Sequence, residues 1–158
     1  MDEKKIGKTV ATNRKARRDY TIEQVFEAGI ALRGMEVKSL RMKGCSIDES
    51  FARVEGQEVY LHNAYIPEFA QSSYFKVDPK RTRKLLLHKK EIRKLLGLTT
   101  QKGLTLIPLK VYFNERGLAK IQLALAKGRR LFDKRKKIKE ELARREAERE
   151  IRRRFKRH

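Results

Sequence analysis

Residues 20–32 read YTIEQVFEAGIAL, and this stretch decides the fold class. Its even positions carry mostly large apolar side chains, whereas its odd positions carry Thr, Glu, Val, Glu, Gly and Ala. A period of two predicts a β-strand that buries one face and leaves the other in water. Thr21 and Gln24 have the spacing of a helix capping box, which is the rival interpretation. The unbroken alternation favours the strand.

Two further strand pairs are indicated downstream, each joined by a turn that contains glycine. The four strands are residues 50–54 and 59–65, around Glu55-Gly56-Gln57-Glu58, and residues 106–113 and 118–126, around Asn114-Glu115-Arg116-Gly117. We expect a positive φ at both glycines. Pro108 cannot donate to a strand ladder, so it predicts an edge or a bulge. Residues 85–87, three leucines, predict a short buried strand.

Short helices are expected between the strands. Val37 and Leu40 stand at i, i+3 within residues 35–41, and residues 89–96 read KKEIRKLL before Gly97, which we expect to end that helix. Several short strands with small helices at their connections are typical of a compact barrel. The sequence therefore predicts a mainly β fold, an OB-fold-like antiparallel β-barrel with short helices.

The charge divides the chain in two. The 158 residues include 41 Lys and Arg against 20 Asp and Glu, a net charge of +21. Residues 127–158 hold sixteen of the basic and six of the acidic residues, which gives +10 and leaves +11 for the rest. We therefore expect a barrel over residues 1–128, with residues 1–12 a flexible N-terminus, and a basic C-terminal tail over residues 129–158.

The tail is poor in apolar residues, so we expect it to be disordered when free and helical when bound to an anionic partner. Glu–Arg pairs stand at i, i+4 in it, among them 140–144, 141–145 and 148–152. Each such pair stabilises an isolated helix by about 0.2–0.5 kcal/mol.

Several classes of protein are excluded by what the sequence lacks. No run of eighteen apolar residues occurs, and the N-terminus MDEKKIGKTV lacks an apolar signal core, so we expect a cytoplasmic protein away from membranes. The single cysteine and the three scattered histidines provide no metal-binding spacing, and no glycine-rich phosphate loop is present. We therefore expect no metal and no cofactor. Asp48 and Glu49 are the one candidate acid–base pair, but adjacent side chains usually point apart, so we expect no enzyme.

Basic residues form four clusters on the predicted barrel and at its junction with the tail. They are Arg14, Lys15, Arg17 and Arg18; Lys38 and Arg41; Lys80, Arg81, Arg83 and Lys84; and Lys127, Arg129 and Arg130. Any one cluster is usually a solvated face. Four of them on one small domain predict contact with RNA phosphates, for which the planar guanidinium of arginine is well suited.

Longer motifs resemble the small protein B, or SsrA-binding protein, family. They are Asn13-Arg-Lys-Ala16, Phe26-Glu-Ala-Gly29, Gly34-x-Glu-Val-Lys-Ser-Leu-Arg41, Asp78-Pro-x-Arg-x-Arg-Lys-Leu-Leu-Leu-His88, Ala126-Lys-Gly128 and Asp133-Lys-Arg135. They follow the order of the family and together cover roughly residues 9–140. Two of them are eight residues or longer, so chance agreement of both is implausible.

The resemblance implies a function in trans-translation. A barrel of this family binds the tRNA-like domain of transfer-messenger RNA (tmRNA) and delivers that RNA to stalled ribosomes. The tail enters the empty mRNA channel of the small ribosomal subunit, meets rRNA at the decoding centre, and becomes helical there. Alanyl-tRNA synthetase and elongation factor Tu act on the same RNA. The resemblance implies no cofactor and no membrane, and we expect a monomer.

Candidate site residues come from the motifs and the basic clusters together. The RNA-binding set is Asn13, Lys15, Arg17, Glu27, Glu36, Lys38, Arg41, Arg83, Lys84, Leu86, His88, Lys127, Arg129 and Arg130. The set expected to meet the ribosome and its decoding centre is Phe132, Asp133, Lys134, Arg135, Lys139 and Ile151. Phe132 stands where the family commonly has His or Tyr, so it keeps a ring for stacking and loses the polar group.

Two of these residues have a second interpretation. The Glu27 carboxylate suits a base amino group or a ribose 2′-OH, and it equally suits a salt bridge that aims an arginine at phosphate. His88 suits an RNA contact or a structural hydrogen bond.

Three functions remain to be compared. The first is the ribosome-rescue factor, and the second is a structural ribosomal protein whose basic tail threads through rRNA, which explains charge and size equally well. The third is an RNA-processing enzyme that uses Asp48 or Glu49. The motifs alone favour the first.

Overall fold

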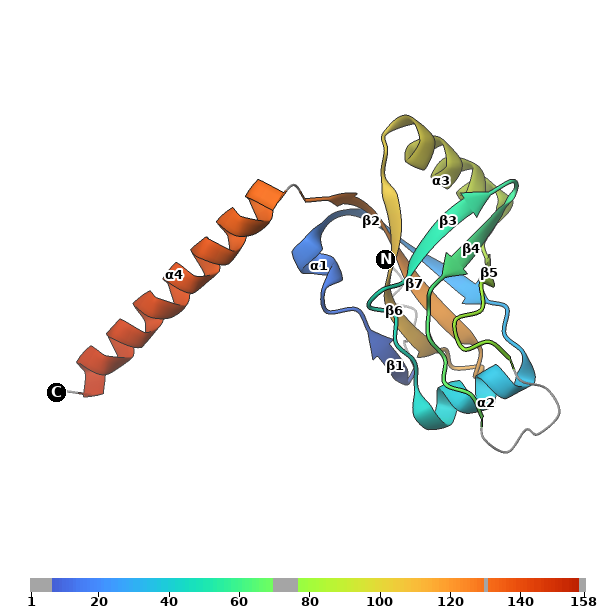
Figure 1. Cartoon of the computed structure of the whole chain (residues 1–158), viewed down its shortest axis with the longest axis horizontal. Coiled ribbons are helices and arrows are strands. Elements are labelled where there is room, and N and C mark those ends of the chain that lie inside the picture. Colours follow the sequence, from blue (N-terminus) through green and yellow to red (C-terminus); the bar gives the residue numbers. More distant parts are fainter. Residues whose placement is uncertain (1–6, 70–76, 130, 157–158) are drawn as a thin grey trace. The chain divides into compact units, whose positions relative to one another are not determined.

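The computed structural model covers the whole chain and describes residues 7–69, 77–129 and 131–156 (Figure 1). It divides into two compact units, Met1–Gly128 and Arg129–His158. The strands of the first unit are β1 (Thr9–Thr12), β2 (Tyr20–Ile30), β3 (Phe51–Glu55), β4 (Glu58–His62), β5 (Arg83–Leu86), β6 (Thr105–Phe113) and β7 (Ala119–Gly128). Its helices are α1 (Ala16–Asp19), α2 (Gly34–Lys43) and α3 (Lys89–Gln101), and the second unit is α4 (Leu131–Lys156).

The strands form one antiparallel sheet that closes into a ring. Hydrogen-bonded neighbours follow the order β6-β3-β4-β5-β2-β7, and β7 pairs again with β6. β6 can serve three neighbours because its two halves differ: Leu106 pairs with Ala52 of β3, whereas Lys110 to Tyr112 pair with β1. Closure leaves few unpaired strand edges. The prediction of a mainly β barrel with short helices is confirmed.

Residues 20–30 of the alternating sequence form strand β2, which lies between β5 and β7 in the ring. β2 pairs with β7 along nearly its whole length and with β5 at its end. Phe26 and Ala28 point into the main core, while Tyr20 and Ile22 pack against a smaller apolar cluster on the other side of an irregularity between Ile22 and Gln24. The strand prediction is confirmed, and the capping-box alternative is wrong.

The core lies inside the ring and under two of the helices. Strand side chains such as Leu61, Leu85 and Leu123 are fully buried there, and α2 and α3 add Leu40 and Leu95. Burial of a side chain of this size stabilises the fold by about 1.5–3 kcal/mol relative to exposure. A core of this kind fixes the outward-facing residues of β2 and β5, which lie next to each other.

The turns agree with the glycine pattern. Gly56 has a φ of 63° and Gly117 a φ of 76°, conformations that a side chain would strain. The register of β6 against β7 shifts between Pro108 and Lys110, so the bulge interpretation of Pro108 is confirmed. The edge interpretation is wrong because β6 has neighbours on both sides.

Three expectations need correction. Helix α3 runs past Gly97 to Gln101, because Leu98 packs against the core and the Thr99 hydroxyl donates to the Leu95 carbonyl at 2.8 Å. Residues 9–12, expected to be flexible, pair with β6 as β1. Of the three leucines expected to be buried, Leu85 is buried, whereas Leu86 is 53% exposed because alternate residues of a strand face opposite sides.

The tail forms the helix α4, and the expectation that it folds only on binding an anionic partner stays a prediction. Arg145 Nη2 lies 3.1 Å from Glu141 Oε1, so this predicted ion pair forms. A further pair, which was not predicted, forms between Arg154 Nε and Glu150 Oε1 at 3.7 Å. In the described part of the chain, no helix has the length and apolar character needed to cross a membrane.

Candidate nucleic-acid interface

An open groove of about 670 Å³ runs between β2 and the segment that leads from β5 into α3. It brings together three residues of the predicted RNA-binding set, Glu27, Leu86 and His88. The register explains this meeting: Gly29 of β2 lies opposite Leu86 of β5. A Cβ at Gly29 would come within 3.3 Å of the Leu86 Cβ, so glycine allows the leucine to lie across the strand. Lys120 of β7 adds a positive charge to the groove.

Glu27 is held from beneath by a tyrosine. The buried Tyr112 hydroxyl of β6 donates a short hydrogen bond to the Glu27 carboxylate. Burial, together with this carboxylate, raises the pKa of Tyr112 above its ordinary value, so the phenol remains a donor. Sequence reasoning considered an RNA group or an arginine as the partner and missed the tyrosine, since Tyr112 lies far away in the chain. The arrangement orients the carboxylate while part of Glu27 stays accessible in the groove.

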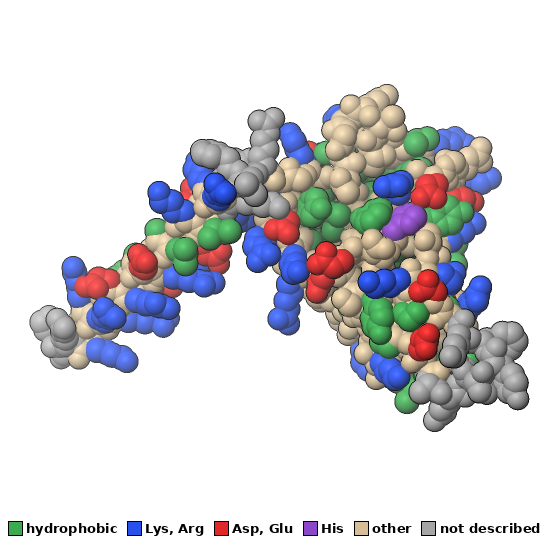
Figure 2. All heavy atoms as spheres, viewed as in Figure 1, with side chains coloured by type: hydrophobic (Ala, Val, Ile, Leu, Met, Phe, Trp, Pro, Cys, Tyr) green, Lys and Arg blue, Asp and Glu red, His purple; other side chains and the backbone are tan. Residues whose placement is uncertain are grey.

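Several basic residues of the predicted set lie on the surface. Figure 2 shows Lys and Arg side chains over the visible face of the barrel, interspersed with Asp and Glu. The exposed ones are Lys15, Arg17, Lys38, Arg41, Lys84 and Lys127, with Arg129 half-buried. Lys15 pairs with Glu49 at 3.3 Å and Lys84 with Glu58 at 3.2 Å. Exposed pairs of this kind contribute about 0–1 kcal/mol, so they yield easily to phosphate.

Arg41 is exposed but fixed in place. Its guanidinium lies 4.6 Å from the centre of the Phe113 ring, and its Nη2 donates to the Gly117 carbonyl at 3.0 Å. A cation over an aromatic face gains about 0.5–1 kcal/mol at an exposed site. Arg41 therefore presents a pre-oriented charge, and it also ties α2 to the β6–β7 turn.

Three residues of the predicted RNA-binding set are buried. Their side chains are therefore not accessible for direct contact with RNA. Asn13, Glu36 and Arg83 are only 6%, 4% and 1% exposed. The Asn13 amide nitrogen donates to the Pro108 carbonyl at 3.0 Å, and its oxygen accepts from the Ala16 backbone at 3.2 Å, so it anchors α1. A polar motif residue can serve folding or binding, and the sequence does not separate the two roles.

Glu36 and Arg83 form the centre of a buried ionic network. The two Glu36 oxygens accept from Arg81 Nη2 at 2.5 Å and from Arg83 Nε at 2.6 Å. Arg83 also donates to the carbonyls of Ala64 and Pro79, at 2.7 and 3.0 Å. Since Arg83 and Leu85 point inward, their neighbours Lys84 and Leu86 point outward. The network therefore positions the exposed residues of β5 relative to α2.

The protonation of this network follows from its contacts. Burial alone would raise the pKa of the Glu36 carboxyl, but hydrogen bonds from the Arg33 backbone, Arg81 and Arg83 hold that pKa below its ordinary value of 4.5. Glu36 is consequently a carboxylate at neutral pH. A buried charge must be paired, and here both partners are arginines.

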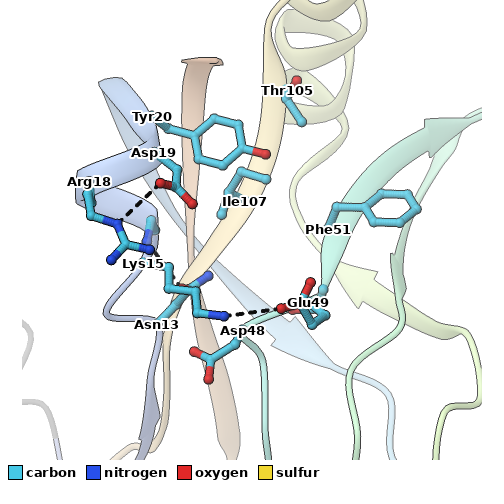
Figure 3. Close-up of a pocket in the computed structure, with 12 residues that line it drawn as sticks. Asn13, Lys15, Arg18, Asp19, Tyr20, Asp48, Glu49, Phe51, Thr105 and Ile107 are labelled. Atoms are coloured by element: carbon cyan, nitrogen blue, oxygen red, sulfur yellow. Dashed lines mark hydrogen bonds and ion pairs between the residues drawn. The ribbon is translucent and has the colours of Figure 1, made fainter. Parts of the chain in front are cut away.

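A second pocket holds the residues of the enzyme hypothesis (Figure 3). Asp48 and Glu49 line it, but their carboxylates point apart, and Glu49 accepts from Lys15 at 3.3 Å. The same pocket is lined by Lys15, Arg18 and Asp19. Arg18 Nε lies 3.4 Å from Asp19 Oδ1, so these two side chains form an ion pair. Within the described ranges, no three His, Cys, Asp or Glu side chains are arranged to hold a metal. The pocket offers charged groups without a convergent acid–base pair.

The predicted tail set falls on α4. Arg135 and Lys139 are exposed, and Ile151 is 55% exposed. Phe132, Asp133 and Lys134 belong to the first turns of the helix, but their side chains lie outside what the structure describes, as does Arg130 altogether.

The comparisons with known proteins agree with each other. A family model described as "SmpB protein" matches residues 10–154. The SsrA-binding protein of Moorella thermoacetica is 56% identical over 144 residues, 91% of this chain and 90% of the relative. That of Thermus thermophilus is 56% identical over 139 residues, 88% of this chain and 96% of the relative.

A solved structure described as "tmRNA-SmpB: a journey to the center of the bacterial ribosome" shares 58% identity with this chain at a TM-score of 0.64. The match covers 77% of this chain and 85% of the other. With the family model spanning barrel and tail alike, the chain belongs to the SmpB family, a family of RNA-binding proteins and not of enzymes.

Proposed function

We propose that this protein binds tmRNA through its barrel and acts with the ribosome in trans-translation. The observation that carries the proposal is the groove where Glu27, Leu86 and His88 meet. A carboxylate, an exposed leucine and an imidazole side by side offer an acceptor, an apolar surface and a ring to unstacked nucleotides, the features by which proteins recognise folded RNA. Relatives named SsrA-binding proteins, and a solved neighbour described as tmRNA-SmpB, support this assignment.

The RNA element in the groove is the tRNA-like domain of tmRNA. The closed ring with its short helices is of the OB-like type, whose outer strand face and loops commonly hold nucleic acid. Lys84 and Arg41 are exposed cations that can neutralise phosphates of the bound RNA. Alanyl-tRNA synthetase and elongation factor Tu act on the same RNA, and the protein works as a cytoplasmic monomer.

The tail serves the ribosome. Its helix, with the Asp133-Lys-Arg135 motif near its start, enters the vacant mRNA channel and meets the decoding centre. Every described side chain of α4 is exposed, so burial within the protein contributes nothing to the helix. We propose that the free tail is largely unfolded and that contact with rRNA makes it helical.

The groove is tested by an exposed leucine and a matched control. Leu86→Asp places a negative charge where an RNA base should lie, and we expect tmRNA affinity to fall at least about tenfold, equal to about 1.4 kcal/mol. Leu96→Asp alters another exposed leucine, 44% against 53%, on α3 outside the groove lining, and should leave affinity unchanged. Fluorescence anisotropy with labelled tmRNA measures both. Equal effects of the two variants would remove the groove from the interface.

A further inference from the structure

Among its described side chains, the tail helix carries two separate pairs of exposed apolar residues. Ile138 and Leu142 form the first pair, 47% and 53% exposed, and Ile151 and Phe155 form the second, 55% and 80% exposed. Each pair stands at i, i+4, so its members lie on one side of the helix. Most other described side chains between and around them are charged. Each pair is therefore a discrete apolar contact available to a partner.

The two pairs do not lie on the same side. An α-helix turns by about 100° per residue, so the thirteen residues between the pair centres place the second pair about 140° around the helix from the first, and about 20 Å along it. A helix that binds one flat surface keeps its apolar residues in a single stripe. α4 departs from this pattern although its backbone is continuous from Leu131 to Lys156.

The charges are arranged in the same two-sided way. Beyond Leu142, the side of the first pair continues as Arg145, Arg149 and Arg153, each within about 40° of it by helical geometry. The side of the second pair begins with charged residues, among them Lys137 and Arg144, and becomes apolar only at Ile151. The first side thus changes from apolar to cationic along the helix, while the other changes from charged to apolar.

We propose that α4 is bound by RNA that surrounds it, with the two apolar pairs contacting opposite walls. The inference rests on the proposed function of the tail and adds which sides of the helix make contact. Residues 131–156 carry twelve Lys and Arg against six Asp and Glu, so the helix is complementary to a polyanion. Apolar and aromatic side chains pack on base faces, and arginines bind phosphates on the side facing them. One flat RNA surface would use only one of the pairs.

The proposal is tested by changing the phase of the helix in the full-length protein. Inserting one Ala between Glu146 and Ala147 rotates the second pair by about 100° and moves it by about 1.5 Å, which brings the two pairs to within about 40° of each other. Inserting Ala-Glu-Ala-Arg at the same point moves the second pair by about 6 Å but rotates it by only about 40°. Both insertions leave the net charge unchanged and use good helix formers.

The readout is tagging of the nascent peptide on purified ribosomes stalled at the end of a truncated message, with tmRNA supplied. We expect the one-residue insertion to reduce tagging at least about fivefold more than the four-residue insertion, because phase matters more than displacement. Equal activity of the two insertions, or greater loss with the longer one, would overturn the proposal.

A second set of variants asks whether both sides of the helix are used. Ile138→Ser with Leu142→Ser, and separately Ile151→Ser with Phe155→Ser, should each lower tagging at least about tenfold, since each removes two apolar contacts with the RNA. Sensitivity of only one pair would indicate a one-sided surface and contradict the proposal. A protein truncated after Arg130 distinguishes failure of the proposed tail function from failure of the two-sided contact. If the truncated protein still supports tagging, the proposed function of the tail is wrong, whatever the insertions show.

Discussion

The barrel and the tail are both strongly basic, but they hold their structure by different means. In the barrel, the buried carboxylate of Glu36 forms salt bridges with Arg81 and Arg83. Arg83 also donates a hydrogen bond to the Ala64 carbonyl. In the tail, every described side chain from Arg135 to Lys156 is exposed. The barrel therefore offers RNA a preformed surface, whereas the tail takes its helical form from local pairs and from whatever surrounds it.

The largest expected difference between the two regions is in their response to loss of one carboxylate. Glu36→Gln leaves Arg83 charged and buried without its anion, so we expect the free energy of unfolding of the barrel to fall by about 3–5 kcal/mol. Glu141→Gln, the matched change in the tail, removes an exposed pair and should cost at most about 0.5 kcal/mol. Denaturant unfolding followed by circular dichroism measures both. Similar losses would contradict the contrast drawn between the regions.

Acid should reduce the effect of Glu36→Gln. Because the folded pKa of Glu36 lies below 4.5, the network stabilises the barrel at neutral pH, and this stabilisation is lost as pH falls below 4.5 through the lowered pKa. The melting temperatures of the parent and Glu36→Gln proteins should thus differ most near pH 7 and converge on acidification. A difference that stays constant down to the lowest pH at which both fold would show that Glu36 is not ionised in the network.

Salt should affect tmRNA binding by the barrel strongly. If the barrel neutralises about six phosphates, log K should fall with log salt at a slope of roughly −4 to −5. Lys38 is exposed on α2, and Lys38→Gln should make the slope shallower by about one unit if it is a phosphate contact. A titration of affinity from low to physiological salt gives both slopes. A slope near zero would mean that the basic clusters are merely solvated.

The smallest effect is expected in the isolated tail. A peptide covering residues 130–158 should show little helix in plain buffer, because two exposed ion pairs of about 0.2–0.5 kcal/mol each do not offset helix nucleation. Added RNA should increase its helical circular dichroism signal. Strong helix in buffer alone would show that the tail is structured before it binds, like the barrel.

Much of the barrel was predictable because local patterns and the final packing agree. The alternation around Phe26 and Ala28 matches their burial, and Gly56 and Gly117 have the positive φ that their turns require. Gly97 was misleading because glycine also occurs inside helices when flanking residues, here Leu98, find a place in the core. Local signals do not contain that tertiary contact.

The motifs named residues that meet in the groove, but they did not reveal which motif residues are buried. Glu27, Leu86 and His88 meet in one groove, which their separation in the sequence does not reveal without the barrel register. Asn13, Glu36 and Arg83 carry the same kinds of polar atoms as surface contacts, but the fold uses those atoms for internal hydrogen bonds. Polar residues of a motif serve binding or positioning, and only their burial separates the two.

The most direct test of the account is truncation after Arg130, measured twice. The truncated protein should bind tmRNA within about twofold of the full chain, because the truncation leaves the groove residues Glu27, Leu86 and His88 unchanged and independent sites act additively. It also predicts that tagging on stalled ribosomes is abolished, since the tail is gone. Loss of tmRNA binding on truncation, or tagging that survives it, would contradict the division of the protein into an RNA-holding barrel and a ribosome-sensing tail.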